Sequence, residues 1–325
     1  MQFDRRTILK LPLLAAAAPE ALEQGMAQAL RPEGDVPGLL RFAALGDSGS
    51  GKPAQLRVAE QMNALHRRRK QDPWSFALMM GDNIYENGEP KYFDDKFIHV
   101  YRELMDDGVN FRATLGNHDI RHNDGRDQVL EPAFGYEGRQ DEYAFSAGPT
   151  LENGKQLARF LCLNSTRWVR AIEAGDTSEV AKLRDRLREQ LRESDKYQWN
   201  IAYLHHPLYS HVKTFAGIIP RGHGPNERLR EILEPEIDET VDVVLAGHEH
   251  FYQKIRPQRG VHHIISGAAG KRRQGVDKKH PNVEFASQDY HFMDLSLSAQ
   301  TLYYQAVNDS GLKIHSGTIA KRNPT

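Results

Sequence analysis

The chain of 325 residues contains one cysteine, Cys162, so an intramolecular disulfide is excluded. It also lacks an excess of either charge, since 43 Lys and Arg stand against 44 Asp and Glu and the net charge is −1. This balance excludes a strongly basic nucleic-acid-binding protein and an acidic disordered tail. The longest apolar run near the start, residues 11–18, is far shorter than the roughly 20 residues of a membrane-spanning helix, so we expect no transmembrane segment.

The composition that is present is ordinary for a globular protein, with 39% hydrophobic and 27% charged residues. Its 15 histidines contrast with the single cysteine. If the protein binds a metal, this contrast favours imidazole and carboxylate ligands over thiolates.

The first thirty residues have the layout of an export signal. Arg5 and Arg6 precede a short apolar stretch with four consecutive alanines, and residues 27–29 read Ala-Gln-Ala, which fits a cleavage site. The arginine pair resembles a twin-arginine signal. We therefore predict that residues 1–30 are a signal peptide that directs the protein to the periplasm or out of the cell. The alternative is an amphipathic helix that happens to carry two arginines.

Short apolar runs of strand length alternate with polar stretches in the rest of the chain. These runs are rich in β-branched and aromatic residues, and each ends at a glycine or a histidine. The expected strands are 40–45, 76–80, 111–115, 201–204, 241–246 and 263–266. Strands that alternate with helices predict an α/β fold, in which ligands collect at the carboxyl ends of the strands.

Two of the intervening stretches have helical periodicity. Residues 54–70 are expected to form a helix whose apolar stripe comprises Leu56, Ala59, Met62 and Leu65. A second helix is expected over 178–194, with Thr177 or Ser178 as its N-cap.

The glycine-rich segment 46–53 allows three interpretations. It nearly matches the phosphate-binding loop of ATPases, but Pro53 replaces the Ser or Thr that holds Mg²⁺ and also lacks an N–H group. An ATPase is therefore disfavoured. In the second interpretation Asp47 is a metal ligand, and the glycines allow a sharp turn beneath it. The third is a simple turn at the end of a strand.

Four further motifs follow in chain order. They are Gly81-Asp82-Asn83-Ile84-Tyr85, Gly116-Asn117-His118-Asp119, Leu204-His205-His206-Pro207 and Gly247-His248-Glu249-His250. With Asp47 they supply the shared anion, oxygen donors and imidazoles that two adjacent cations need. The potential ligands are Asp47, Asp82, Tyr85, Asn117, His205, His248 and His250. We expect His248 and His250 to lie on a turn that aims both side chains at the site.

Read together, these motifs resemble those of the purple acid phosphatases (tartrate-resistant acid phosphatase type) within the calcineurin-like metallophosphoesterases. The resemblance covers nearly all of residues 40–270, and Tyr85 separates this branch from the wider superfamily. It implies a sandwich of two packed mixed β-sheets flanked by helices, with the metal site at strand carboxyl ends. Residues 38–325 would form a single catalytic domain.

The implied activity is hydrolysis of small phosphomonoesters by attack of a metal-bound hydroxide. A phosphodiesterase or nucleotide-cleaving enzyme on the same metal core is the alternative, and would differ in the loops 120–156 and 207–226. A non-catalytic phosphate-binding protein is the third hypothesis, and it predicts lost ligands or lost proton donors. No nucleic-acid partner is expected beyond a nucleotide substrate, and the sequence does not specify the natural substrate or the oligomeric state.

The resemblance also implies a role for each ligand. Asp82 bridges two metal ions, and the other six ligands divide between an Fe³⁺ ion and a divalent Fe, Zn or Mn ion. The Fe³⁺ ligands are Asp47, Tyr85 and His250, and the divalent-ion ligands are Asn117, His205 and His248. A Tyr85 phenolate on Fe³⁺ would give a visible absorption band.

Proton transfer is implied for two histidines that do not bind metal. His118 is expected to contact the phosphate and protonate the leaving group, which suits a side chain whose pKa lies near the working pH. The second is His223, in a segment that resembles the family's His-Gly-Pro motif, with His211 as the alternative. Residues 212–220 resemble an insertion beside the pocket, and His206 either faces away or lines the site.

Two features stay open. The basic residues 271–273 follow a glycine-rich turn and either meet the substrate or form a solvated loop. Asn164 stands where family members often have Asp, at a position that is not a metal ligand. Cys162 lies in an apolar strand and is expected to be a core residue.

Overall fold

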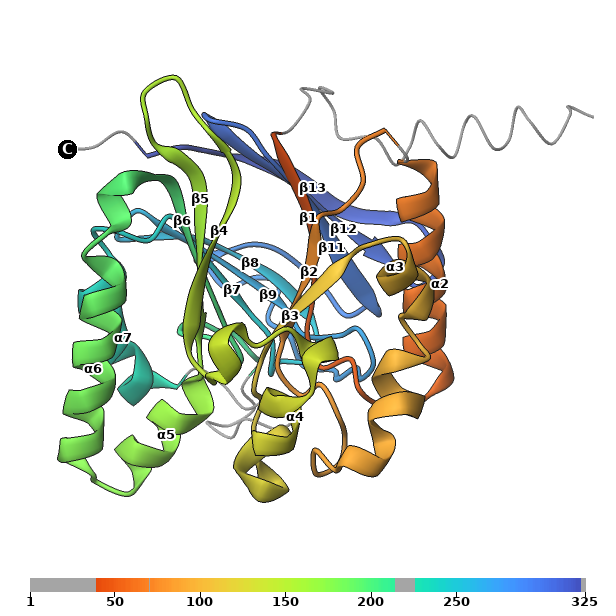
Figure 1. Ribbon diagram of the computed structural model, residues 1–325, viewed down its shortest axis with the longest axis horizontal. Coiled ribbons are helices and arrows are strands. Elements are labelled where there is room, and N and C mark those ends of the chain that lie inside the picture. Colours follow the sequence, from red (N-terminus) through yellow and green to blue (C-terminus); the bar gives the residue numbers. More distant parts are fainter. Residues whose placement is uncertain (1–38, 70, 214–225, 323–325) are drawn as a thin grey trace, which may run out of the picture.

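The computed structural model describes residues 39–69, 71–213 and 226–322. The predicted signal peptide, the proposed proton donor His223 and most of the predicted insertion lie outside these ranges. Two mixed β-sheets pack face to face, and helices cover their outer faces (Figure 1). The expected α/β sandwich is therefore confirmed. No helix in the described part of the chain is long and apolar enough to cross a membrane.

The first sheet has six strands in the order β13-β12-β11-β1-β2-β3. Its parallel strands are β1 (Leu40–Leu45), β2 (Phe76–Met80) and β3 (Asn110–Thr114). The antiparallel strands are β11 (His291–Leu297), β12 (Thr301–Asn308) and β13 (Lys313–Ala320). The helices α2 (Pro53–Arg68) and α3 (Arg102–Asp106) lie on its outer face (Figure 1).

The second sheet has seven strands in the order β10-β8-β9-β7-β6-β5-β4. Its parallel strands are β5 (Gln156–Leu163), β6 (Tyr197–Leu204), β7 (Val243–Ala246) and β9 (Val261–Ser266). The antiparallel strands are β4 (Tyr143–Thr150), β8 (Tyr252–Gln258) and β10 (Val283–Ser287).

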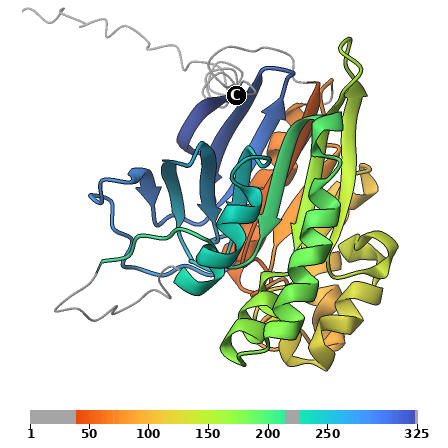
Figure 2. The same cartoon turned by 90° about the vertical axis from the view of Figure 1, so that its left-hand side faces the viewer.

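Three helices cover the outer face of the second sheet: α5 (Ser165–Glu173), α6 (Thr177–Leu191) and α7 (Glu227–Ile237). Figure 2 shows α5 and α6, in green, in front of this sheet. Leu183 and Leu187 of α6 and Leu229 and Leu233 of α7 pack against Leu161 and its neighbours in the sheet. The segment between β3 and β4 contains a short helix, α4 (Arg126–Leu130), and several single 3₁₀ turns.

An aromatic core joins the two sheets. Phe42 of β1 stacks on Phe76 of β2, and both rings meet the edge of Phe160 of β5 at a centroid distance of 5.1 Å. Burying one such ring contributes roughly 1.5–3 kcal/mol. The Thr114 hydroxyl donates to the Leu163 carbonyl across the interface, at 3.0 Å. These contacts hold the ends of β3 and β5 together.

Both expected helices are present, although α2 ends at Arg68 and α6 at Leu191, and two further details differ from the sequence analysis. Leu56 is 51% exposed, because the buried stripe of α2 runs through Val58, Ala59, Met62 and Leu65, and Leu56 lies outside it. The N-cap of α6 is Asp176, whose carboxylate accepts the Glu179 N–H at 2.9 Å, so neither Thr177 nor Ser178 caps the helix.

The expected strands are all present, and Cys162 is buried in β5 as predicted. The sequence analysis did not identify the antiparallel strands β4, β8 and β10–β13. Of these, β11 pairs with β1 and extends the first sheet.

Candidate metal centre

Five of the potential ligands directly follow the carboxyl ends of five parallel strands, as expected. Asp47 follows β1, Asp82 follows β2, Asn117 follows β3, His205 follows β6 and His248 follows β7. The first three strands belong to the six-stranded sheet and the last two to the seven-stranded sheet. The site therefore forms where the two sheets meet.

The backbone turns sharply at three of these residues. Asp47, Asp82 and His248 have positive φ values of 56°, 52° and 68°, and each follows a glycine. A left-handed conformation costs a non-glycine residue roughly 1–2 kcal/mol. The turn expected at His248 is thus present.

Two glycines are needed because the strand ends approach each other closely. A Cβ on Gly81, whose φ is +79°, would lie 2.6 Å from His205 Nδ1. A Cβ on Gly116 would overlap the backbone N and the carboxylate of Asp82. Any larger residue at either position would push the potential ligands apart.

Three donor atoms form a first triangle. Tyr85 Oη donates to Asp47 Oδ1 at 3.0 Å and lies 3.2 Å from His250 Nε2, and His250 Nε2 lies 3.3 Å from Asp47 Oδ1. Atoms bound to one metal ion at about 2.1 Å lie about 3 Å apart when their bonds are at right angles. The triangle has the size that a single ion requires.

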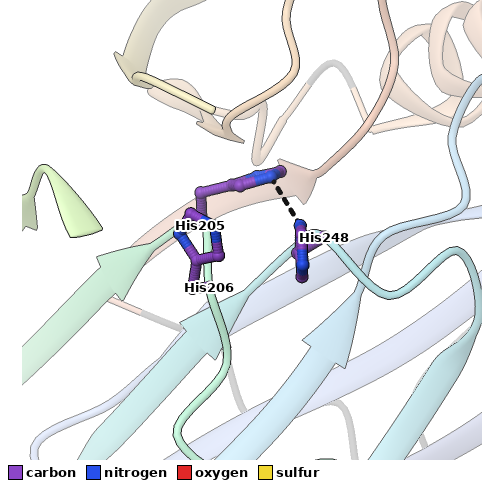
Figure 3. A group of neighbouring side chains, drawn as sticks. All are labelled: His205, His206 and His248. Atoms are coloured by element: carbon purple, nitrogen blue, oxygen red, sulfur yellow. Dashed lines mark hydrogen bonds between the residues drawn. The ribbon is translucent and has the colours of Figure 1, made fainter. Parts of the chain in front are cut away.

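A second group of donor atoms surrounds His205 Nε2. Asn117 Oδ1 lies 3.0 Å from this nitrogen and His248 Nδ1 lies 3.1 Å from it, the contact drawn as a dashed line in Figure 3. The other ring nitrogen of His205 lies 2.9 Å from the Met80 carbonyl oxygen. A hydrogen bond there fixes the ring and leaves Nε2 available as a ligand.

Asp82 lies between the two groups. Its Oδ1 is 3.6 Å from His205 Nε2, and its carboxylate also interacts with the Tyr85 hydroxyl. Carboxylate or imidazole atoms of Asp47, Asp82 and His205 all lie within 4.8 Å of one another. Asp82 is thus placed to contact ions on both sides.

The electrostatics of the site fit bound cations. Asp47 and Asp82 are fully buried, and within the described ranges neither forms an ion pair with Lys or Arg. Burial raises the pKa of Asp47 to about 8, and burial beside the two carboxylates raises the pKa of Tyr85 well above its usual value. Buried carboxylates without a cationic side chain are typical of metal sites, so this donor set fits metal ions.

His118 lies at the edge of the site. Its Nδ1 is 2.7 Å from the Glu86 carbonyl oxygen, and its Nε2 is 3.9 Å from Asp82 Oδ2. The ring also meets the Tyr85 ring edge to face, at a centroid distance of 4.6 Å. His118 thus presents one nitrogen toward Asp82 without joining either group of donor atoms.

The basic segment 271–273 reaches the same edge. Lys271 Nζ lies 2.9 Å from Glu86 Oε1 and 3.5 Å from the centroid of the Tyr85 ring. The backbone N–H of Arg273 donates to the His250 carbonyl at 2.9 Å. Lys271 therefore contacts residues at the edge of the site, and contact with the substrate stays a prediction.

His206 lines the site. Its ring centroid is 4.5 Å from that of His248, and Figure 3 shows the two imidazoles beside His205. The three histidines form a group whose ligand atoms lie within 4.8 Å of one another. Ser165 Oγ lies 3.0 Å from His206 Nδ1 and accepts the backbone N–H groups of His205 and His206.

The alternative proton donor His211 has a different environment. It stacks on His280 with ring centroids 3.6 Å apart, and its backbone N–H donates to Gln253 Oε1 at 2.9 Å.

The sequence analysis did not assign roles to Ser165 or Asp119. The buried Asp119 carboxylate accepts the N–H groups of Asn83, Ile84 and Gly116 and so ties two ligand loops together. Asp119 belongs to the motif Gly116-Asn117-His118-Asp119, and this position was the signal in the sequence that could have identified its role.

Comparisons with known proteins agree with this geometry. The family model described as calcineurin-like phosphoesterase matches residues 40–252. Purple acid phosphatase 7 of Arabidopsis thaliana is 24% identical over 311 residues, which cover 88% of each chain. Tartrate-resistant acid phosphatase type 5 of Homo sapiens is 24% identical over 316 residues, covering 87% of this chain and 91% of the relative.

Two solved structures share the fold. GAP50, the anchor in the inner membrane complex of Plasmodium, superposes with a TM-score of 0.69 at 20% identity, over 87% of this chain and 89% of GAP50. The purple acid phosphatase PPD1 from yellow lupin (Lupinus luteus) seeds gives 0.65 at 17% identity, over 86% of this chain and 53% of PPD1. At these identities the likeness concerns the fold alone.

Proposed function

Because the chain belongs to the calcineurin-like phosphoesterase family, we propose that it hydrolyses phosphomonoesters at a dinuclear metal centre. The observation that carries this proposal is the pair of donor groups joined by Asp82, each with the spacing of ligands on one ion. The names of the relatives, purple and tartrate-resistant acid phosphatases, support the choice of monoesters. The ATPase interpretation is discarded, because the family is a different one.

We assign each ligand a role within this proposal. Asp82 would hold both ions, an Fe³⁺ ion together with Tyr85 and a divalent Fe, Zn or Mn ion together with His205. The Fe³⁺ ligands are Asp47, Tyr85 and His250, and the divalent-ion ligands are Asn117, His205 and His248. When bound, the two cations would activate water at acidic pH and neutralise the charge that develops on the phosphoryl group.

His118 is the proposed proton donor to the leaving group. In a neutral ring whose Nδ1–H donates to the Glu86 carbonyl, Nε2 is the nitrogen that takes up a proton, on the side that faces Asp82 and within 3.4 Å of Arg121 Nη2. Protonated His118 then delivers the Nε2 proton to the leaving oxygen. For the second donor we retain His223, with His211 as the alternative; the stacking of His211 on His280 supports this preference.

Natively purified protein tests the proposal through its metal content, visible spectrum and turnover. We expect two metal ions per chain, at least one of them iron, and a visible band that disappears in Tyr85→Phe. Tyr303→Phe, in β12, is the matched control and should retain the band. p-Nitrophenyl phosphate should be cleaved faster than bis(p-nitrophenyl) phosphate, with the optimum below neutral pH.

Other results point elsewhere. Faster cleavage of the diester would establish the phosphodiesterase alternative. Two divalent ions without colour would remove the Fe³⁺ assignment but leave a metallophosphoesterase. Two bound ions without turnover of either ester would favour a non-catalytic phosphate-binding role.

We also propose export through a twin-arginine signal in residues 1–30, supported by Arg5, Arg6 and the Ala-Gln-Ala sequence at 27–29. Replacing both arginines by lysine should retain the protein in the cytoplasm of a bacterial host that has this pathway. Unchanged export of the double variant would contradict the signal assignment.

A further inference from the structure

Lys271 lies over the ring of Tyr85, one of the candidate metal ligands. Its Nζ is 3.5 Å from the ring centroid, well inside the roughly 6 Å within which an aromatic face attracts a cation. The ring is buried, so water does not weaken this attraction. Within residues 39–69, 71–213 and 226–322, no other Lys or Arg lies over this ring, and Lys96 contacts Tyr85 only at its backbone carbonyl.

The backbone on either side of Lys271 is bonded to two other candidate ligands. The Gly270 N–H donates to the Asp47 carbonyl at 3.1 Å, and the Arg273 N–H donates to the His250 carbonyl at 2.9 Å. Both of these ligands belong to the first triangle of donor atoms. The ammonium group of Lys271 therefore has a defined place relative to that triangle.

Glu86 engages the same ammonium group. Nζ lies 2.9 Å from Glu86 Oε1 and 3.1 Å from Oε2. An ammonium group has three N–H donors, so two carboxylate oxygens and the ring of Tyr85 account for all of them. The side chain of Lys271 is 21% exposed and that of Glu86 is 61% exposed, so water screens the carboxylate more than the ammonium group. The ring is therefore influenced mainly by the cation.

A cation in this position acts on the electrons of the ring. The negative charge of a phenolate is spread partly over its ring, and an ammonium group at 3.5 Å lowers the energy of those electrons. A metal ion bound at Tyr85 Oη would lie beyond the ring edge and so farther from Nζ than the ring does. Lys271 should therefore lower the energy of the ring electrons more than that of the acceptor levels of the ion.

We propose that Lys271 is a positioning residue of the metal centre, whose ammonium group stabilises the ring electrons of the Tyr85 phenolate and so sets the energy at which they move to the bound ion. The inference rests on the proposed function, because it takes the ion bound by Tyr85 to be Fe³⁺. It gives Lys271 a role that acts through a ligand and needs no contact with the substrate.

The visible band of the natively purified protein measures this energy. Lys271→Met removes the charge and keeps a long side chain, so the band should move to longer wavelength by roughly 10–20 nm, the scale of a lost cation–ring attraction. Lys271→Gln should give the same shift. Lys271→Arg should keep the band near its original position, because a guanidinium group also stacks on aromatic rings. Circular dichroism and metal analysis check that each variant is folded and loaded.

The matched control is Arg272→Met, in the same segment and with the same change in net charge. Arg272 is exposed, and its guanidinium group lies over Tyr290, 5.0 Å from the ring centroid. Tyr290 is not a candidate ligand, so the band should stay in place. An equal shift in Arg272→Met and Lys271→Met would reflect a general effect of charge and would overturn the proposal.

The remaining outcomes separate this inference from the proposed function. An unmoved band in Lys271→Met overturns the inference alone, and a raised KM for p-nitrophenyl phosphate beside it would show that Lys271 meets the substrate instead. Loss of iron from both Lys271→Met and Lys271→Gln would also overturn it, because Lys271 would then be needed for metal binding itself. Unmodified protein without iron or without a band would overturn the inference together with the Fe³⁺ assignment.

Discussion

The two sheets contribute different chemistry to the candidate metal centre. The loops after β1, β2 and β3 carry all the oxygen donors, which are Asp47, Asp82, Tyr85 and Asn117. The loops after β6 and β7 carry all the nitrogen donors, which are His205, His248 and His250. Neither sheet alone offers a complete set of ligands for either of the two proposed ions, so the candidate site exists only while the sheets are packed together.

The difference also concerns charge. The oxygen side buries two carboxylates, and burial raises the pKa of Asp47 to about 8, whereas burial lowers the pKa of His250 on the nitrogen side to about 4. Both shifts favour the neutral forms of the side chains, and bound cations oppose both costs by pairing with carboxylates and neutral imidazoles. Metal binding should therefore strengthen the contact between the sheets.

The largest effect is expected from removing one ligand on each side. Asp82→Asn should abolish loading of the metal pair and reduce turnover to background, because Asp82 contacts both donor groups. His205→Ala should remove only the divalent ion and leave the Tyr85 band in place. The metal content per chain measures the loss of ions in each variant. The control is Asp185→Asn, because Asp185 is exposed on α6. Two ions in purified Asp82→Asn would contradict the bridging assignment.

His118 tests this difference between the two sheets, because its imidazole belongs to the loop after β3, on the side of the oxygen donors. His118→Ala should retain both metals and reduce kcat by ~10²–10⁴-fold, the usual contribution of a general acid. Metal analysis and steady-state kinetics on p-nitrophenyl phosphate test this, with the exposed His122→Ala as the control. If His118→Ala lost its metals, the assignment of His118 as a proton donor would be wrong.

Replacing Ser165 should have a smaller effect on metal binding, on the side of the nitrogen donors. Ser165→Ala removes the acceptor of the His205 and His206 N–H groups, at 3.2 and 2.9 Å, and the contact with the His206 ring. Loss of such a supporting contact lowers metal affinity by roughly 10–100-fold. Competition with a chelator measures the affinity of the divalent ion. The exposed Ser146→Ala should behave as the unmodified protein does, and equal affinity in Ser165→Ala would show that Ser165 does not position the ligands.

The smallest effect concerns stability in acid. Burial lowers the pKa of His263, in β9 of the seven-stranded sheet, to about 3, so the folded protein keeps this ring neutral while the unfolded chain protonates it below about pH 6.5. This group's contribution is complete above that pH and is lost as the pH falls toward 3. Between pH 7 and pH 5 the loss amounts to about 2 kcal/mol.

Urea unfolding of chelated protein at these two pH values tests the point. His263→Gln should lose about 2 kcal/mol less than the unmodified protein over this interval. The exposed His99→Gln serves as the control. An identical pH dependence in His263→Gln and the unmodified protein would show that His263 titrates normally in the fold.

Much of the fold and the set of candidate ligands could be predicted from sequence, because short apolar runs define strands and a Gly followed by Asp, Asn or His marks their ends. The cross-sheet distances were not accessible, since nothing in the local pattern states that the end of β2 meets the end of β6. The role of Ser165 and the contact of Lys271 with Tyr85 depend on that packing. Leu56 shows the limit of periodicity, because helical spacing does not fix which face of α2 the sheet covers.

Anomalous X-ray scattering from crystals of the natively loaded protein, recorded on both sides of the iron edge, tests the central claim most directly. Our account predicts two peaks about 3.5–4 Å apart, one on each side of Asp82, with iron on the Tyr85 side. A single peak, or ions bound away from Asp82, would contradict it.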